Sequence, residues 1–227
     1  MMNIQPIGII RSPYKEKFGV PRQPNLVSLG TGELHLLPPF NQAECVRGLE
    51  QFSHLWLLFV FNQTMAQGWQ PTVRPPRLGG NEKMGVFASR STFRPNPIGL
   101  SAVELQDICI DKDRIILQLG SVDIVDNTPI IDIKPYIPYS DCYPDAKAGY
   151  ANNKPGKQLT VQFNQHTQTQ LLSQPALQQL IIQVISQDPR PAYKQKSLKR
   201  QEFGISLYQF NIRFCVENNV ATIVSIE

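Results

Sequence analysis

The sequence lacks the cysteine and histidine clusters that hold structural metals or disulfide frameworks. Its four cysteines contain no pair spaced two residues apart, and its three histidines are equally scattered. Structural zinc needs clustered ligands, so we expect no metal site. The same spacing favours reduced thiols, as in a cytoplasmic protein.

Signatures of the common enzyme classes and of membrane proteins are also missing. The chain has no GxGxxG, GxxxxGK[ST], HExxH or GxSxG motif, so nothing indicates a dinucleotide fold, a phosphate loop, a zinc protease or a serine hydrolase. No signal peptide is visible, and the longest apolar run, residues 55–61, is too short to span a bilayer. We therefore expect a cytoplasmic protein without membrane contact.

What the 227 residues do contain is a globular composition, with 41% hydrophobic and 18% charged residues. Such a chain can bury a core without disulfides and form one large domain or slightly more. Its net charge of +4 is mildly basic. That charge permits a polyanionic partner but does not require one.

The first 140 residues carry mostly strand patterns. The apolar run at 55–61 predicts a strand buried on both faces. Residues 103–110 and 115–119 predict a straight or bulged strand and its hairpin partner. One short helix is expected at residues 42–51, where apolar residues recur at helical spacing.

The rest of the chain changes character at residues 141–157, where Pro, Gly and Asn predict a linker or long loop. Beyond it, apolar positions between 177 and 185 follow one face of a helix, and residues 208–216 alternate as in a half-buried strand. We therefore divide the chain into a domain at 1–140, a linker at 141–157 and a smaller α+β domain at 158–227.

The most unusual segment is residues 74–101, which we call the basic loop. It carries five cationic side chains and a single acid, Glu82, together with four prolines and four glycines. Long loops with a specified backbone usually have a function. Arginines suit phosphate, carboxylate and stacked bases, and Phe87 and Phe93 suit base stacking. A rigid, solvated connector is the simpler alternative.

Two further stretches carry candidate chemistry. Asp123 and Asp126 lie three residues apart near a strand end, where they are either turn-capping residues or a carboxylate that binds a cation or accepts a proton. Residues 11–25 are again basic and rich in proline and aromatic side chains, and the amides of Asn62 and Gln63 directly follow the apolar strand.

These stretches together resemble the TrmO family of S-adenosylmethionine-dependent tRNA methyltransferases. The resemblance rests on Pro21-Arg-Gln-Pro, Phe59-Val-Phe-Asn-Gln63, Arg77-Leu-Gly-Gly and, above all, Val86-Phe-Ala-Ser-Arg-Ser-Thr-Phe-Arg-Pro-Asn-Pro-Ile-Gly-Leu-Ser101. It covers most of residues 1–140 and extends more loosely to the C-terminal unit. There, Asp188-Pro-Arg-Pro-Ala-Tyr193 looks like part of the family's tail domain.

The resemblance implies a mostly β protein, with an N-terminal antiparallel β-barrel and a smaller α+β C-terminal domain. It implies S-adenosyl-L-methionine as the cofactor, bound without a Rossmann fold, and a homodimer with cofactor sites near the subunit interface. The implied substrate is tRNA, methylated at N6 of the threonylcarbamoyladenosine at position 37 of threonine-type tRNA. A non-catalytic RNA-binding barrel that uses the same basic loop is the alternative.

The resemblance also implies site residues. The positions that match cofactor contacts are Pro24, Asn25, Leu26, Asn62, Gln63, Arg90, Leu100, Gly120, Ser121, Val122 and Asp123. Asp123 and Asp126 are the candidates for a general base. We assign tRNA contacts to Arg74, Arg77, Lys83 and Arg94 and, unless that segment is only a solvated loop, to Lys194, Lys196, Lys199 and Arg200.

Overall fold

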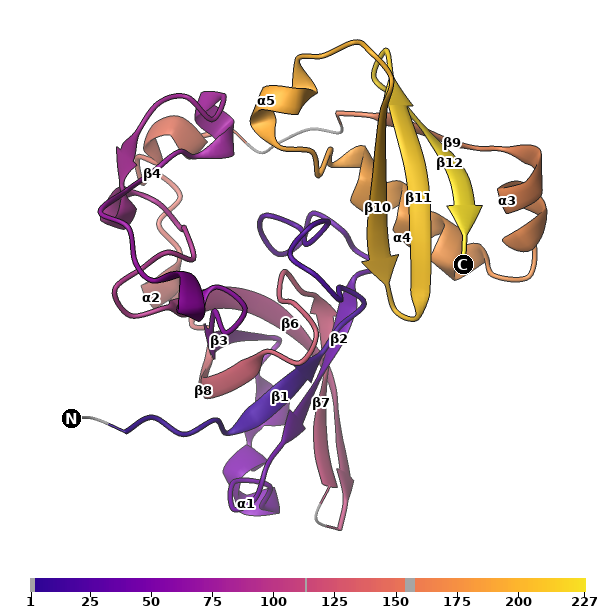
Figure 1. Ribbon diagram of the computed structural model, residues 1–227. Helices are drawn as coiled ribbons and strands as arrows, with labels where there is room; N and C mark the ends of the chain where they lie inside the picture. Colours follow the sequence, from indigo (N-terminus) through magenta and orange to yellow (C-terminus); the bar gives the residue numbers. More distant parts are fainter. Residues whose placement is uncertain (1–2, 113, 154–157) are drawn as a thin grey trace.

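Six antiparallel strands close into a barrel in the computed structural model, which describes residues 3–112, 114–153 and 158–227 (Figure 1). The order around the barrel is β1-β2-β7-β6-β3-β8, closed where Gly8 pairs with Ile130. The strands are β1 (Gly8–Arg11), β2 (Thr31–Leu36), β3 (His54–Val60), β6 (Ile98–Asp111), β7 (Arg114–Ser121) and β8 (Pro129–Pro135). The predicted antiparallel barrel is confirmed.

Alternation along the strands builds the barrel core. Leu55, Leu57 and Phe59 of β3 are buried, while Trp56, Leu58 and Val60, which alternate with them, face outward and stay partly exposed. The prediction of a strand buried on both faces was therefore wrong for β3. A closed barrel has one interior, so an apolar strand within it must present its other side chains outside.

The strand β6 and the segment at 42–51 each contain a break in their regular structure. The expected bulge in β6 is present, as a register shift between Leu105 and Asp107. The expected helix at 42–51 is instead divided into α1 (Ala43–Val46) and a 3-10 turn (Leu49–Gln51). Gly48 separates them with φ of 85°, a left-handed conformation that ends a helix.

The basic loop is the later part of the connection from β3 to β6 and runs into the first residues of β6; before β6 it has little regular structure. The short pair β4 (Thr72–Val73) and β5 (Met84–Gly85) and two 3-10 turns, Pro76–Leu78 and Val86–Ala88, shape it. The expected linker packs against it. The Tyr150 hydroxyl donates to Ala88 O (3.4 Å), and Arg77 donates to Asn153 O (2.9 Å). Residues 154–157 of that expected linker lie outside the described residues.

The C-terminal unit is a four-stranded sheet with short helices, in the order β10-β11-β12-β9. Its strands are β9 (Thr160–Phe163), β10 (Gln201–Leu207), β11 (Phe210–Glu217) and β12 (Val220–Ile226). The remaining α-helices of the described residues are α2 (Pro138–Asp141), which precedes this unit, and α3 (Gln165–Gln170), α4 (Pro175–Ser186) and α5 (Ala192–Gln195) within it. The expected amphipathic face of α4 is buried at Leu177, Leu180, Ile181, Val184 and Ile185.

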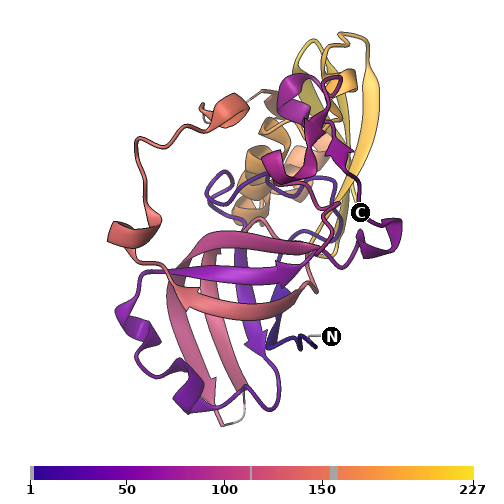
Figure 2. The same cartoon turned by 90° about the vertical axis from the view of Figure 1, so that its left-hand side faces the viewer.

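Residues 12–30, between β1 and β2, join the barrel to the C-terminal unit. They loop out between the two bodies in both views (Figures 1 and 2). Tyr208 N donates to Pro13 O (2.8 Å), and Ser206 N donates to Glu16 Oε1 (3.1 Å). The rings of Phe18 and Phe203 stack, with centroids 6.0 Å apart. The segment that holds the expected cofactor residues 24–26 is therefore anchored on both sides.

Candidate active site

Segments far apart in sequence meet at the barrel end where β3 and β7 finish and β6 begins. Asn25 N donates to Ser121 Oγ (3.0 Å), and Ser121 Oγ donates to Val27 O (2.8 Å). Ser101 Oγ donates to Asp123 Oδ1 (2.6 Å), which ties β6 to the end of β7. These bonds bring three of the expected cofactor residues, Asn25, Ser121 and Asp123, to the same end of the barrel.

We call this place the rim site and define it by Asn25, Arg90, Leu100, Ser121 and Asp123. Arg90 reaches it from the basic loop, where its Nη1 donates to Gln23 Oε1 beside Pro24. The charge of Arg90 also acts on Asp123 and favours the ionised carboxylate. The rim site therefore holds one cationic and one anionic side chain near each other.

Asp123 is the member with unusual proton chemistry. Burial raises the pKa of its carboxyl from 3.8 to about 6, although the Ser101 hydrogen bond and the Arg90 charge act in the opposite direction. At neutral pH most of the carboxylate is ionised, yet it binds a proton more readily than an exposed aspartate does. That is the property expected of a general base near pH 7.

The other expected cofactor positions divide into exposed and buried ones. Asn62 and Gln63 directly follow β3 and are exposed, and Leu100 is 52% exposed on β6. Gly120 and Val122 are buried, as is Ser121, whose hydroxyl is already hydrogen-bonded. The 120–122 stretch can therefore offer a ligand its backbone atoms more readily than its side chains.

This set of groups suits S-adenosylmethionine. Arg90 can pair with a carboxylate, and Asp123 can face a cationic group such as a sulfonium. The exposed Leu100 and the half-buried Leu26 offer apolar surface for an adenine ring. Asn25 adopts φ of 63°, which turns the backbone sharply at this point. The residues present thus match the anionic, cationic and apolar parts of the cofactor.

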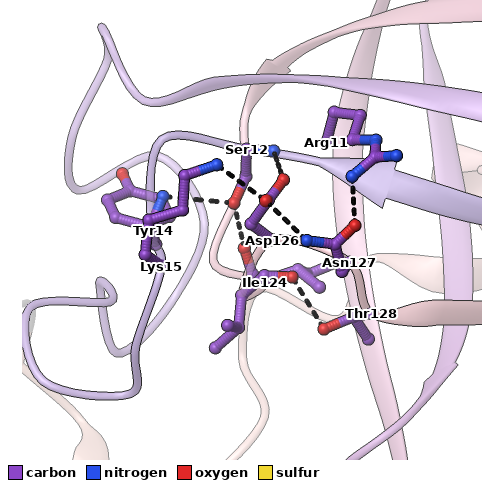
Figure 3. Close-up of polar contacts among 9 residues, drawn as sticks. Arg11, Ser12, Tyr14, Lys15, Ile124, Asp126, Asn127 and Thr128 are labelled. Carbon is purple, nitrogen blue, oxygen red and sulfur yellow. Dashed lines mark hydrogen bonds and ion pairs between the residues drawn. The ribbon is translucent and has the colours of Figure 1, made fainter. Parts of the chain in front are cut away.

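Asp126 does not share this environment (Figure 3). It is buried, and its carboxylate accepts from Lys15 Nζ (2.7 Å), Ser12 N (3.0 Å) and Asn127 Nδ2 (2.8 Å). The bonds from Lys15 and Ser12 fasten the start of the 12–30 segment to the chain between β7 and β8. Because its carboxylate is occupied in this way, we retain only Asp123 as the candidate base.

The residues assigned to tRNA occupy three settings. Arg74 and Lys83 are exposed, and Arg77 is exposed with one nitrogen bonded to Asn153 O. Arg94 instead is half-buried and donates to two carbonyls within its own loop, Val86 O (3.2 Å) and Ser89 O (2.7 Å). The structure therefore separates Arg94 from the other three.

The basic side chains of the C-terminal unit lie on and after α5. Lys196 and Lys199 are exposed, Lys194 lies over the ring of Phe203, and Arg200 pairs with Glu202 at 3.2 Å. α5 is close to the basic loop, since a Cβ on Gly80 would lie 3.3 Å from Ala192 Cβ. The two basic segments are therefore neighbours across the two units.

Sequence reasoning missed several residues that shape the rim site. Gln23 orients Arg90, Ser101 orients Asp123, and Gln183 of α4 accepts from Leu29 N at 3.1 Å. Ser101 and Gln23 fall within motifs already noted for their composition, but nothing in the sequence indicated their partners. Gln183 lies on a helix of the other unit and carried no signal at all.

Within residues 3–112, 114–153 and 158–227, no group of three or more potential metal ligands comes together. In the same described part of the chain, no helix has the length and apolar character needed to cross a membrane.

Comparisons with known proteins agree with the fold. The model of the tRNA-methyltransferase O N-terminal domain matches residues 9–142, and that of the TrmO C-terminal domain matches residues 156–227. The chain is an S-adenosylmethionine-dependent methyltransferase built on a β-barrel. It belongs to the tRNA-methyltransferase O family.

Individual relatives cover nearly the whole chain. A tRNA (adenine(37)-N6)-methyltransferase of Escherichia coli is 57% identical over 214 residues, which is 92% of this chain and 91% of that protein. A putative S-adenosylmethionine-dependent methyltransferase of Pseudomonas aeruginosa is 44% identical over 218 residues, 93% of this chain and 91% of the relative. A crystal structure of TrmO from P. aeruginosa superposes with a TM-score of 0.76 at 37% identity, covering 100% of this chain and 97% of that one. An enzyme is therefore favoured over a non-catalytic RNA-binding barrel.

Proposed function

We propose that this enzyme transfers a methyl group from S-adenosylmethionine to N6 of adenosine 37 in tRNA. The observation that carries the proposal is the rim site, where Arg90 of the basic loop is held by Gln23 and its charge acts on Asp123. Relatives named as tRNA (adenine(37)-N6)-methyltransferases, from E. coli to human, support the same reaction. Exposed cations on the basic loop and after α5 provide a surface for the RNA backbone.

The finer substrate that we propose is threonylcarbamoyladenosine in threonine-type tRNA. This base carries a carboxylate of its own, and arginine is well suited to bind a carboxylate. Arg77, which is exposed and has one guanidinium nitrogen bonded to Asn153 O, is the arginine of the basic loop that we assign to this carboxylate. An unmodified adenosine has no such group, so this pairing would favour the modified base.

For this reaction the protein must position the two reactants and accept a proton from N6. S-adenosylmethionine supplies an electrophilic methyl group, and an in-line displacement depends mainly on how the two reactants are positioned. The lone pair on N6 is conjugated with the base, and N6 must lose a proton during the reaction. Asp123, held by Ser101 and poised by burial, is the group that we assign to accept that proton.

We also propose that the enzyme works as a homodimer with the cofactor sites near the interface. The outer face of β3 and β6 carries the apolar cross-strand pairs Leu58–Leu100 and Val60–Ile98. Ile98 and Leu100 are 36% and 52% exposed, which would leave apolar surface in water if the face were uncovered. Leu58→Glu should convert a dimer to a monomer in sedimentation equilibrium, and an unchanged mass would reject this face as the interface.

The reaction can be tested in cells from which the protein has been removed. Nucleosides from their threonine tRNA, analysed by mass spectrometry, should lack the N6-methyl form of threonylcarbamoyladenosine and retain the unmethylated form. Restoring the wild-type protein should return the methylated nucleoside, whereas Asp123→Asn should not. An unchanged level of the methylated nucleoside in the deleted cells would reject the proposed substrate.

A further inference from the structure

The side chain of Arg94 is directed at the backbone of its own loop. Its Nη1 donates to Ser89 O at 2.7 Å and to Val86 O at 3.2 Å, and the side chain is half-buried. The guanidinium carbon also lies 5.8 Å from the centroid of the Phe87 ring. An arginine that binds an RNA phosphate presents its donors to solvent. Nη1 of Arg94 instead donates to two carbonyl oxygens of its own loop.

The carbonyls that Arg94 binds belong to a single tight turn. Val86–Ala88 form a 3-10 turn, closed by hydrogen bonds from Ser89 N (3.2 Å) and Ser89 Oγ (2.9 Å) to Val86 O. One such turn has little stability by itself, and the carbonyls at its end need partners. Arg94 supplies a charged donor to both ends of the turn and thereby fixes its shape.

The residue that follows this turn is Arg90. Its guanidinium reaches Gln23, and its charge acts on Asp123 at the rim site. Since Arg90 is attached directly to Ser89, any loosening of the turn displaces its side chain. Tyr150 contacts the same turn through Ala88 O, but with a longer hydrogen bond of 3.4 Å. The hydrogen bonds from Arg94 to this turn are thus shorter than the one from Tyr150, and their donor is charged.

We propose that Arg94 is a positioning residue for the cofactor: it braces the turn at 86–89 and so holds Arg90 at the rim site. This replaces the expectation that Arg94 contacts RNA. The inference rests on the proposed function, because it takes Arg90 to bind S-adenosylmethionine and the basic loop to face tRNA. Lys83, exposed on the same loop, provides a matched control.

Two measurements on purified full-length protein separate the roles. Calorimetric titration gives the Kd for S-adenosylmethionine, and tRNA binding across a salt series gives the slope of log K against log salt. Arg94→Ala should raise the cofactor Kd about tenfold, the effect expected for losing hydrogen bonds from a charged group, and leave the slope unchanged. Lys83→Ala should leave the cofactor Kd unchanged and reduce the slope by about 1.

The reverse pattern, an unchanged cofactor Kd and a reduced slope for Arg94→Ala, would overturn the proposal and leave the proposed function intact. Failure of the wild type to bind S-adenosylmethionine would overturn both. Should Arg94→Ala not fold, Arg94→Lys takes its place. Lysine keeps the charge that a phosphate needs but ends one atom short of Nη1, so cofactor affinity should fall without a change in slope. Wild-type affinity in Arg94→Lys would contradict the bracing role.

Discussion

Asp123→Asn should make the protein more stable at neutral pH while it removes the proposed base. Folding raises the pKa of Asp123 from 3.8 to about 6, mainly because the carboxylate is buried. The folded state therefore holds the proton more tightly than the unfolded chain. Stability from this group is fully present below pH 4 and is lost as the pH rises through 6. Asparagine keeps an oxygen that can accept from Ser101 but carries no charge to bury.

The size of the effect follows from the two pKa values. A shift of about two units corresponds to about 3 kcal/mol between the limits of low and high pH. Between pH 5 and pH 8, the advantage of Asp123→Asn over the wild type should widen by about 1.4 kcal/mol. Other titrating groups are common to both proteins, so they cancel in this difference.

Urea denaturation without cofactor, followed by circular dichroism at the two pH values, measures that difference directly. The wild type and Asp123→Asn should show equal slopes against urea, so that a change in midpoint reports stability alone. An advantage that stays constant between pH 5 and pH 8 would show that the Asp123 pKa is not raised. An advantage that shrinks would show that it is lowered and that Arg90 outweighs burial.

Two more predictions concern RNA binding and the C-terminal unit. Phe87→Ala removes a ring that is 78% exposed and available for stacking with a base. It should weaken tRNA binding by about 1–3 kcal/mol in filter binding without changing the salt slope. Unchanged affinity would exclude base stacking on Phe87. Arg190→Ala leaves Asp188 buried without its partner at 2.7 Å and should cost about 3–5 kcal/mol in urea denaturation. Arg213→Ala, at an exposed position of β11, is the matched control, and equal losses in the two variants would reject this reason.

The parts of the site that follow from short motifs could be located from the sequence. The basic loop, Asn25 and Asp123 were all identified there, and the structure brings Asn25, Asp123 and the Arg90 of that loop together. Their partners could not be identified, because a hydrogen bond such as that from Ser101 of β6 to Asp123, just after β7, depends on a strand register that the whole barrel sets.

The direction of side chains in loops was harder to predict from the sequence than the location of the motifs. Asp123 and Asp126 are three residues apart and looked equivalent, yet one faces Ser101 and the other is fastened to Lys15. Arg94 looked like any loop cation, and only the turn at 86–89 directs it inward. The partial exposure of the outward face of β3 could not be predicted either, since an apolar run by itself does not distinguish a barrel strand from a strand buried on both faces.

The measurement that tests the central claim most directly is methyl transfer by the purified protein. Threonine tRNA carrying threonylcarbamoyladenosine is incubated with S-adenosylmethionine bearing a deuterated methyl group, and the nucleosides are analysed by mass spectrometry. The label should appear on N6 of the modified base at position 37 with the wild type, and not with Asp123→Asn. No label in that nucleoside with folded, cofactor-binding wild type would contradict the account.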